Sequence, residues 1–565
     1  MKNQWVMKPA PELNTLELLM KEVRLSVPIA TILAQRGINT YEKAKAFFRP
    51  EKSHLHNPFL MKDMDKAVDR ILHAIESNQK IMVYGDYDVD GTTSVAMVYD
   101  FLRSIYPNIQ YYIPDRYKEG YGISFQVIDQ AEKDEISLII ALDCGIKAID
   151  KVDYALSKNI DFIICDHHLP SETLPKAFAV LDPKRKDCSY PFKELSGCGV
   201  GFKLIQGIAI KKEISEEIIF NYLDLVAVSI AADIVSITGE NRVLAHYGLE
   251  VLRKSPRPGI KALLGEISAE NISISNIVFS VAPRINASGR LEHASQSVKL
   301  LISNEKSEIS TIFSQIDELN KQRKEKDENI TVEAIQLIKD NKEEERFSTI
   351  VYHPEWHKGV LGIVASRLIE TYYRPTLVLT KGNEGEITGS ARSVKDFDIY
   401  EVIDACSDLL IRYGGHQFAA GLTLAEENLE KFKEKFEFLV KEKIQPIQRI
   451  PSLEIDVEIP FSSINTQFVN VLNQIKPYGP GNMTPLFLTR GLIGGFVTKM
   501  GKNNEHLRLD LKDKNGITFK GVAFGMSEFI QDFQYGTFDI VYSIDENHWK
   551  NKTYLQLNIR DVHFT

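Results

Sequence analysis

Cysteine is scarce in this sequence, and its few cysteines are poorly placed for cross-linking. Five occur in 565 residues, an odd number with no CxxC pair; they are Cys144, Cys165, Cys188, Cys198 and Cys406. This pattern argues against a disulfide framework and against a structural zinc knuckle. A reducing compartment suits such a chain best, and we expect a cytoplasmic protein.

Long apolar runs are also lacking. No stretch approaches the ~18 to 20 apolar residues that a membrane helix requires. The opening residues, MKNQWVMKPAPELN, contain no apolar signal core. We therefore expect neither secretion nor a membrane partner.

An excess of positive charge is the third thing that the sequence does not have. Lys and Arg number 68 and Asp and Glu number 77, which gives a formal net charge of −9. A wholly basic nucleic-acid coat is excluded by this balance, whereas local basic grooves remain compatible with it.

The chain is long enough for three or four domains, because one hydrophobic core typically serves ~100 to 200 residues. Its pattern changes at several points. We expect an N-terminal extension, a first α/β domain, a polar connector helix, a smaller α/β domain and a C-terminal antiparallel β-barrel resembling an OB fold; these cover residues 1–60, 61–303, 304–346, 347–445 and 450–565.

Short apolar bursts alternate with helical patterns in the first α/β domain. The bursts are IMVYGDYD, YYIP, LIIALDCG, FIICDHH and AFAVLDP, between residues 81 and 183. Near-continuous apolar runs separated by helices are typical of a parallel sheet covered on both faces. The fold class is therefore α/β, with a doubly wound parallel sheet.

Acidic residues and histidines follow several of these bursts. We interpret them as lying at four strand ends, where the carboxyl edge of an open α/β sheet binds ligands; they are Asp86, Asp88, Asp90, Asp143, Asp166, His167, His168 and Asp233. Like charges this close require a cation. Asp and His ligands without thiolates suit Mn²⁺ or Mg²⁺.

Each of these motifs also has a simpler interpretation when it is taken alone. The DxDxDG segment is not an EF-hand loop, because Met97 stands where that loop needs a Glu. Asp143 or Asp233 alone would more often be a turn or cap residue, and two adjacent histidines are as often surface imidazoles as ligands. Cys144 and Cys165 are expected to be small core residues rather than nucleophiles.

Four segments taken together resemble a known family. GDYDVDGTTS, ALDCG, CDHHLP and AADIV occur in the order of the four motifs of the DHH phosphoesterase superfamily. SARS (390–393) and GGHQFAAG (414–421) resemble its DHH-associated domain, DHHA1, which closes over the substrate. EGYG, CGVGFK, PRINASGR, WHKGVLGIVASRL, KPYGPGN and the β-rich tail are similar to the bacterial single-strand-specific 5′ to 3′ exonucleases of that superfamily.

The resemblance implies a site with two divalent cations, Mn²⁺ or Mg²⁺. Its expected metal ligands are Asp88, Asp90, Asp143, His167 and Asp233. Asp143 would bridge the ions, His168 would face the phosphate, and Asp86 would be a ligand or a supporting partner. Two departures affect this set: many relatives have a His where this chain has Tyr84, and the fourth motif continues with Ser236.

Residues that hold the strand are expected in two places. By resemblance, Arg392, Ser393 and His416, with the backbone N–H groups of Gly414 and Gly415 in a turn, bind the terminal 5′ phosphate or its neighbour. Arg284 and Arg290 flank a Gly-containing loop, where phosphate contact and an ordinary salt bridge are about equally expected. In the OB-like domain, aromatic side chains offer stacking surfaces for bases, and Trp549 is the best exposed candidate.

The predicted function is a metal-dependent exonuclease that degrades single-stranded DNA from a 5′ end to 5′-mononucleotides in recombination and repair. Candidate protein partners are single-strand-binding protein and a helicase. One alternative is a DHH phosphodiesterase of small nucleotides, oligoribonucleotides or cyclic dinucleotides, which would not need the C-terminal domain. The other is a non-catalytic DNA-binding replication scaffold, although the acid set is intact.

Overall fold

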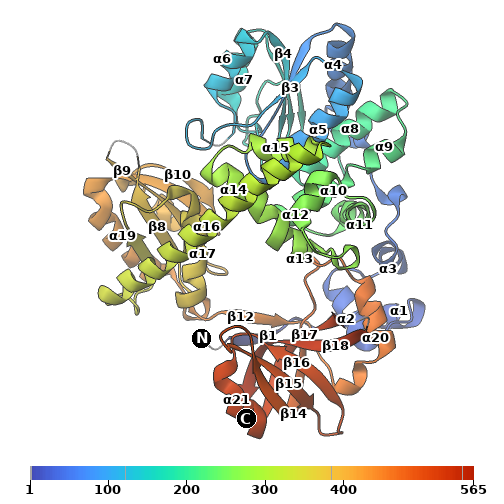
Figure 1. Cartoon of the computed structure of the whole chain (residues 1–565), viewed down its shortest axis with the longest axis vertical. Helices are drawn as coiled ribbons and strands as arrows, with labels where there is room; N and C mark the ends of the chain where they lie inside the picture. Colours follow the sequence, from blue (N-terminus) through green and yellow to red (C-terminus); the bar gives the residue numbers. More distant parts are fainter. Residues whose placement is uncertain (1–2, 121, 383–384, 550–551) are drawn as a thin grey trace. The chain divides into compact units, whose positions relative to one another are not determined.

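A computed structural model describes residues 3–120, 122–382, 385–549 and 552–565 (Figure 1). The chain divides into two compact units. The first unit contains Asn57–Val235 and Tyr247–Pro451. The second contains Asn3–His56, Ser236–His246 and Ser452–Thr565, so it joins segments that are far apart in the sequence.

A five-stranded parallel sheet is the centre of the first unit, as the apolar bursts predict. Its order is β3-β2-β4-β5-β6, and every neighbouring pair is parallel. The strands are β2 (Lys80–Gly85), β3 (Ile109–Tyr112), β4 (Ile136–Leu142), β5 (Asp161–Cys165) and β6 (Ala179–Leu181). Their residues are almost continuously buried, which is the mark of a sheet covered on both faces.

Helices cover this sheet. α6 and α7 pack on the face that carries Met82 and Tyr84, where they share one apolar cluster. The helices around the sheet are α4 (Met64–Glu76), α5 (Val89–Ile105), α6 (Phe125–Lys133), α7 (Ile149–Ser157) and α8 (Gly197–Lys211). α5 and α8 are buried along nearly their whole length, so apolar residues occur on all sides of them.

The chain between the two sheets of the first unit is helical. It ends in α16 (Lys306–Asp340), which confirms the expected long connector helix (Figure 1). The helices before it are α9 (Glu216–Phe220), α10 (Leu223–Ala232), α11 (Gly239–Lys254), α12 (Pro258–Leu264), α13 (Ile274–Asn276), α14 (Ala282–Leu291) and α15 (Ser295–Ile302). A π-helical turn, Ile277–Val281, joins α13 to α14.

The smaller α/β domain has a mixed sheet of order β10-β11-β9-β8-β7. Only β7 and β8 are parallel, and the other pairs are antiparallel. The elements are β7 (Thr349–Tyr352), α17 (Leu361–Tyr372), β8 (Thr376–Lys381), β9 (Glu386–Arg392), α18 (Ile399–Asp404), β10 (Leu410–His416), β11 (Ala419–Ala425) and α19 (Leu429–Lys443).

The second unit is built on a closed barrel, as predicted. β14, β15, β16, β18 and β17 pair in that order, and β14 also pairs with β17 to close the ring. The strands are β14 (Phe487–Met500), β15 (His506–Lys512), β16 (Thr518–Ala523), β17 (Thr537–Trp549) and β18 (Lys552–Phe564), and β13 (Val457–Glu458) pairs with β14. Helices α20 (Thr466–Gln474) and α21 (Ile530–Tyr535) accompany them.

The N-terminal segment belongs to the second unit. β1 (Gln4–Met7) pairs in parallel with β12 (Ser452–Ile455). The Trp5 ring stacks on His563, with centroids 3.6 Å apart, and its Nε1 donates to Asp561. The apolar side chains of α1 (Leu13–Glu22), α2 (Val27–Gln35) and α3 (Tyr41–Phe48) join the core of the barrel domain.

Three local predictions are wrong. AADIV is the end of helix α10 and not a strand, since a short apolar run that is buried all round has no diagnostic period. PRINASGR forms helix α14 rather than a loop, because its proline occupies the first turn, where no N–H is needed. Gly414 and Gly415 lie within β10 and not in a turn.

No helix of the described residues combines the length and the apolar character needed to cross a bilayer. The side chain of Trp549 lies outside what the structure describes.

Candidate metal centre and phosphate-binding residues

The predicted acids and histidines meet at the carboxyl edge of the parallel sheet. Asp86 follows β2, Asp143 follows β4, and Asp166 with the two histidines follows β5. Asp233 arrives differently, because it is the C-terminal cap of helix α10. The topology therefore brings residues that are up to about 150 positions apart to one edge, as expected for a ligand site in an open α/β sheet.

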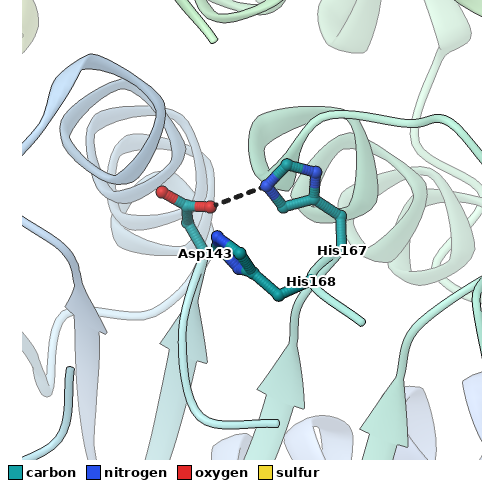
Figure 2. A group of neighbouring side chains, drawn as sticks. All are labelled: Asp143, His167 and His168. Carbon is teal, nitrogen blue, oxygen red and sulfur yellow. Dashed lines mark ion pairs between the residues drawn. The ribbon is translucent and has the colours of Figure 1, made fainter. Parts of the chain in front are cut away.

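His167 lies at the centre of this group. Its Nε2 atom is 3.1 Å from Asp143 Oδ1 (Figure 2). The same atom is 3.6 Å from Asp233 Oδ2 and 3.7 Å from Asp90 Oδ2. Two sets of ligand atoms lie within 4.8 Å of one another: Asp143 with both histidines, and Asp90 with His167 and Asp233. Both sets share His167, so the geometry fits cations bound side by side.

Several polar atoms here have no hydrogen-bond partner among the described residues. Both ring nitrogens of His167 and Oδ1 of Asp143 and of Asp86 are buried without one. Burial, and after it Asp90 and Asp88, raises the pKa of Asp143 well above its ordinary value. Burial lowers the pKa of His167. Orphaned carboxylate oxygens around a neutral imidazole are the donor set that a divalent cation uses.

Asp90 is fixed at the N-terminus of helix α8. Gly197 N donates to Asp90 Oδ2 and Cys198 N donates to Oδ1, each at 2.7 Å, and Ser229 Oγ adds a 2.7 Å bond to Oδ1. The helix dipole and the unpaired N–H groups of a first turn favour an anion there. Gly197 is required as well, since a Cβ on it would lie 2.7 Å from the Asp143 side chain.

The first motif turns sharply from strand into helix. Asp88 is the N-cap of α5, and its Oδ1 accepts from Gly91 N at 3.1 Å. A Cβ on Gly91 would collide with the Asp86 backbone, so the turn needs glycine at this position. Burial, followed by repulsion from Asp88, raises the pKa of Asp86 well above its ordinary value. Asp88 itself stands outside the two ligand sets described above.

Asp233 is held by an unusual turn. The next residue, Ile234, has a φ of +58° and a side chain that is 69% exposed. This left-handed position after a helix is normally glycine, and a β-branched residue there is strained. Burial, followed by Asp90 and Asp88, raises the pKa of Asp233 to about 8. The turn thus aims a carboxylate into a crowded acidic site.

Asp166 orients the two histidines rather than joining the ligand sets. Its Oδ1 accepts from His168 Nδ1 at 2.7 Å and from the backbone N of His167 at 2.8 Å, and its Oδ2 accepts from Ile146 N at 2.9 Å. Burial opposes its charge, but these bonds hold the pKa of Asp166 at about 2. Although burial disfavours a charged imidazole, the Asp166 carboxylate raises the pKa of His168.

The two residues that depart from the family pattern, Tyr84 and Ser236, make contacts away from the acidic residues. The Tyr84 hydroxyl donates to Gly122 O at 2.7 Å, and the ring is fully buried. It therefore serves the loop around Gly122 and not the acidic residues. Ser236 Oγ lies 2.9 Å from Thr238 Oγ1.

We name Asp86, Asp88, Asp90, Asp143 and Asp233, with His167, the acidic cluster. Arg392 and Arg290, both predicted to bind phosphate, belong to a second group. Arg392 ends β9, and its Nη1 donates to Ser390 Oγ at 3.1 Å. Arg290 Nη1 donates to Gly359 O at 3.0 Å. Burial, followed by Arg116, Arg323 and Arg392, lowers the pKa of Arg290 to about 10.

Arg116 was not singled out by the sequence analysis. It follows β3, so it lies beyond the same edge of the sheet as the acidic residues. This position after a strand was the feature of the sequence that could have indicated a functional role. Its guanidinium lies over the Tyr87 ring, 5.0 Å from the centroid, and its charge lowers the pKa of Asp86 against the effect of burial. We name Arg116, Arg290 and Arg392 the cationic cluster. None of the described carboxylates forms an ion pair with these three arginines.

The remaining predicted residues separate into two kinds. Arg284 is held by Asp317 of α16 at 2.9 Å, which matches the salt-bridge interpretation. Gly414, Gly415 and His416 are exposed on the edge strand β10. His416 and Arg392 both pair with Ala419 of β11, so the register places them in one row of the sheet. Ser393 Oγ donates to Phe397 O at 2.7 Å.

Family models match three parts of the chain. Residues 80–230 match the DHH family N-terminal domain, residues 346–442 match the DHHA1 domain and residues 455–561 match the RecJ OB domain. These segments coincide with the parallel-sheet domain, the mixed-sheet domain and the barrel.

Several curated proteins similar to the chain share one name. A protein of Bacillus subtilis named single-stranded-DNA-specific exonuclease RecJ is 35% identical over 557 residues, covering 98% of this chain and 70% of that protein. The protein of the same name from Escherichia coli is 32% identical over 88% of this chain and 90% of its own length. The crystal structure of RecJ from Thermus thermophilus in complex with Mn²⁺ superposes with a TM-score of 0.85 at 24% identity, covering 99% of this chain and 79% of that one.

Proposed function

The chain belongs to the RecJ family of single-stranded-DNA-specific exonucleases, and we propose that it hydrolyses single-stranded DNA from a 5′ end with divalent cations. One observation carries this proposal above the others. The Nε2 atom of His167 has three carboxylate oxygens within 3.7 Å, while neither ring nitrogen has a hydrogen-bond partner among the described residues, and a bound divalent cation satisfies this arrangement.

The metal ligands we assign are Asp88, Asp90, Asp143, His167 and Asp233. Two Mn²⁺ or Mg²⁺ ions bound there would neutralise the clustered charge and supply hydroxide for attack on phosphorus near neutral pH. The chain's own task is to hold these atoms in place before substrate arrives. Helix α8 does so for Asp90, the cap of α5 for Asp88, and Gly197 for the close approach to Asp143.

His168 and Asp166 form the pair that faces the phosphate. Asp166 accepts from His168 Nδ1 and, against the effect of burial, raises the pKa of that imidazole, which favours its cationic form. Such a cation stabilises the charge that develops on the non-bridging phosphate oxygens. Asp86, whose carboxyl pKa is raised, supports the ligands from behind or joins them.

The cationic cluster supports degradation that starts at the 5′ end of the strand. Three guanidiniums without carboxylate partners are costly to keep together unless an anion of high charge joins them. A terminal phosphate carries more charge than an internal one and matches the planar fork of arginine. We assign Arg116, Arg290 and Arg392, with Ser393, His416 and the backbone of Gly414 and Gly415, to the 5′-terminal phosphate. Arg284 keeps a supporting role through Asp317.

The barrel domain supplies a second contact with the strand. Phe496, Phe524 and Tyr554 are at least half exposed on it, which suits stacking against bases. A second site on one chain lengthens residence on the strand, and this favours repeated removal of 5′-mononucleotides. We therefore assign the protein to the processing of strand ends in recombination and repair. Single-strand-binding protein or a helicase would be the partner that supplies these ends.

Strand specificity is tested with matched substrates. A 5′-phosphorylated oligonucleotide and its blunt duplex are digested with Mn²⁺, and release of acid-soluble nucleotide is measured for each. The expected result is a much faster initial rate on the single strand. Equal rates on the two substrates would overturn the assignment.

A further inference from the structure

The segment after β3 carries the Arg116 guanidinium and is held by hydrogen bonds that involve Glu119 and Tyr84. It leaves the sheet at Tyr112 and reaches α6, whose N-cap is Ser124. Asp115 starts the turn: its Oδ1 accepts from Tyr117 N at 2.8 Å and from Lys118 N at 3.1 Å. We name the stretch from Asp115 to Gly120 the arginine loop.

Glu119 binds three parts of this region at once. Its Oε1 accepts from the Tyr112 hydroxyl at 3.0 Å and from Asp115 N at 2.8 Å. Its Oε2 accepts from Ser124 Oγ at 2.8 Å. One carboxylate therefore ties the end of the strand, the start of the loop and the cap of the next helix. Bonds to a charged acceptor are roughly twice as strong as neutral ones, so this tie is firm.

Tyr84 fastens the far end of the same region. Its hydroxyl donates to Gly122 O at 2.7 Å, and its ring lies nearly parallel to that of Tyr112 with centroids 5.9 Å apart. Tyr84 stands in β2, two residues before Asp86. The strand that leads to the acidic cluster is thus bonded directly to the region that carries Arg116.

The arginine loop also reaches the rest of the cationic cluster. The Tyr117 hydroxyl donates to the backbone O of Arg290. Lys358 lies over the Tyr117 ring at 4.2 Å from the centroid, and Arg116 lies over Tyr87 at 5.0 Å. A shift of this loop would therefore move Arg116 relative to both Arg290 and the acidic residues next to Tyr87.

We infer that Glu119 is a positioning residue, with Tyr84 as its second anchor, that sets where Arg116 meets the 5′-terminal phosphate. This inference rests on the proposed function, because it names the residues through which one phosphate contact of that site is built. It also gives Tyr84 a role. The tyrosine that stands where many DHH relatives have histidine fastens the loop instead of binding a cation.

The test compares Glu119→Ala, Glu119→Gln and Tyr84→Phe on oligonucleotides with a 5′ phosphate or a 5′ hydroxyl. We expect Glu119→Ala to raise KM on the phosphorylated strand about tenfold, with kcat changed less than about threefold, because misplacement by ~1 Å weakens a positioned contact. On the 5′-hydroxyl strand KM should stay near the wild-type value. Glu119→Gln keeps an acceptor for Tyr112 and should recover part of the loss. Tyr84→Phe removes one hydroxyl and should raise KM about threefold.

A double-mutant cycle with Arg116→Ala separates positioning from a general structural effect. If Glu119 acts through Arg116, the double variant should be no worse than Arg116→Ala alone. Additive losses, or a fall in kcat that is equal on both strand ends, would overturn the inference. The matched control is Glu132→Ala, a carboxylate of α6 paired with Lys158 at the surface, which should leave both constants unchanged.

Failure of the inference and failure of the proposed function give different results. If Arg116→Ala removes the preference for a 5′ phosphate while Glu119→Ala and Tyr84→Phe keep it, the positioning role is refuted and the phosphate site stands. If the wild-type enzyme shows no such preference, the proposed phosphate contact of Arg116 fails together with the positioning role.

Discussion

The acidic cluster and the cationic cluster of the first unit are opposite in charge but alike in construction. Each gathers buried or half-buried groups that are mainly of one sign: Asp143, Asp86 and Asp233 have raised carboxyl pKa values, and the Arg290 pKa is lowered. Burial of like charges is unfavourable unless a counter-charge arrives. In the proposed function that counter-charge is a divalent cation for the acids and a phosphate for the arginines.

The clusters differ in where their residues come from. Acids of the first motif lie within five positions, and others follow β4 and β5 directly. The arginines come from three separate places: a loop after β3, helix α14 and strand β9. The acidic cluster forms within the parallel-sheet domain, whereas the cationic cluster combines arginines from both α/β domains of the first unit. Catalysis and end recognition can therefore be disturbed separately.

The Asp143→Ala substitution should separate catalysis from end recognition most clearly. We expect it to have the largest effect of the substitutions considered. Removing the carboxylate 3.1 Å from His167 Nε2 should lower kcat by ~10³-fold or more, because a proposed metal ligand is lost. Binding of single-stranded DNA should persist, since the arginines are untouched. Rates on end-labelled strands and fluorescence anisotropy in Mn²⁺ measure the two quantities.

Asp153→Ala is the matched control for that variant, because Asp153 is an exposed carboxylate on α7. It should cleave at the wild-type rate. Cleavage retained by Asp143→Ala would contradict the assignment of the acidic cluster.

Arg392→Ala disturbs the other cluster. We expect KM for a 5′-phosphorylated strand to rise by about 10- to 100-fold, because a charged hydrogen-bonding partner is lost, while kcat falls much less. Arg392→Lys should recover only part of the affinity, since an ammonium keeps the charge but not the planar fork. Steady-state kinetics on both strand ends measures this effect.

Arg346→Ala, which removes an arginine paired with Glu343 away from the cluster, should change neither constant. If Arg392→Ala lowered kcat as much as Asp143→Ala does, both clusters would act in the same step. That result would contradict separate roles for the two clusters.

Stability against pH gives the smallest expected effect. Asp233 has a pKa of about 8 when folded and an ordinary value of 3.8, so the metal-free folded protein binds more protons than the unfolded one across this range. Its free energy of unfolding should therefore fall as pH rises from about 4 to 8, the opposite of the usual trend for a salt-bridged Asp. In EDTA we expect Tm to drop by about 2–6 °C between pH 5 and pH 8.5.

Two comparisons check the cause of that drop. Asp233→Asn stays neutral at every pH and should reduce the slope, whereas Asp153→Asn should not. Mn²⁺ should raise Tm most at the higher pH, where the carboxylates are ionised and bind the ion. A Tm that rises with pH in EDTA would contradict the raised pKa of Asp233.

Much of the acidic cluster could be predicted from the sequence because its signals are local. An apolar burst followed by Asp143 or by Asp166 and His167 reads directly as a strand end with a ligand. The same reasoning failed for Asp233, because α10 is buried all round and its apolar run has no period of its own. The exit from this helix depends on the left-handed Ile234, which no residue preference indicates.

Fewer of the long-range features could be predicted. The parallel sheet, the long helix α16 and the closed barrel follow from apolar patterns. The pairing of β1 with β12 does not, since short strands carry no record of a partner about 450 residues away. Arg116 was missed for a similar reason: a single arginine after an edge strand becomes notable only beside Arg290.

The most direct test of the account follows both ends of one strand. A single-stranded oligonucleotide labelled at its 5′ or 3′ end is digested in Mn²⁺, in Mg²⁺ and in EDTA. The account predicts early release of the 5′ label as a mononucleotide, late release of the 3′ label, and no cleavage in EDTA, because the arginines place the 5′ phosphate beside an acidic cluster that needs cations. Early release of the 3′ label, or cleavage that persists in EDTA, would contradict it.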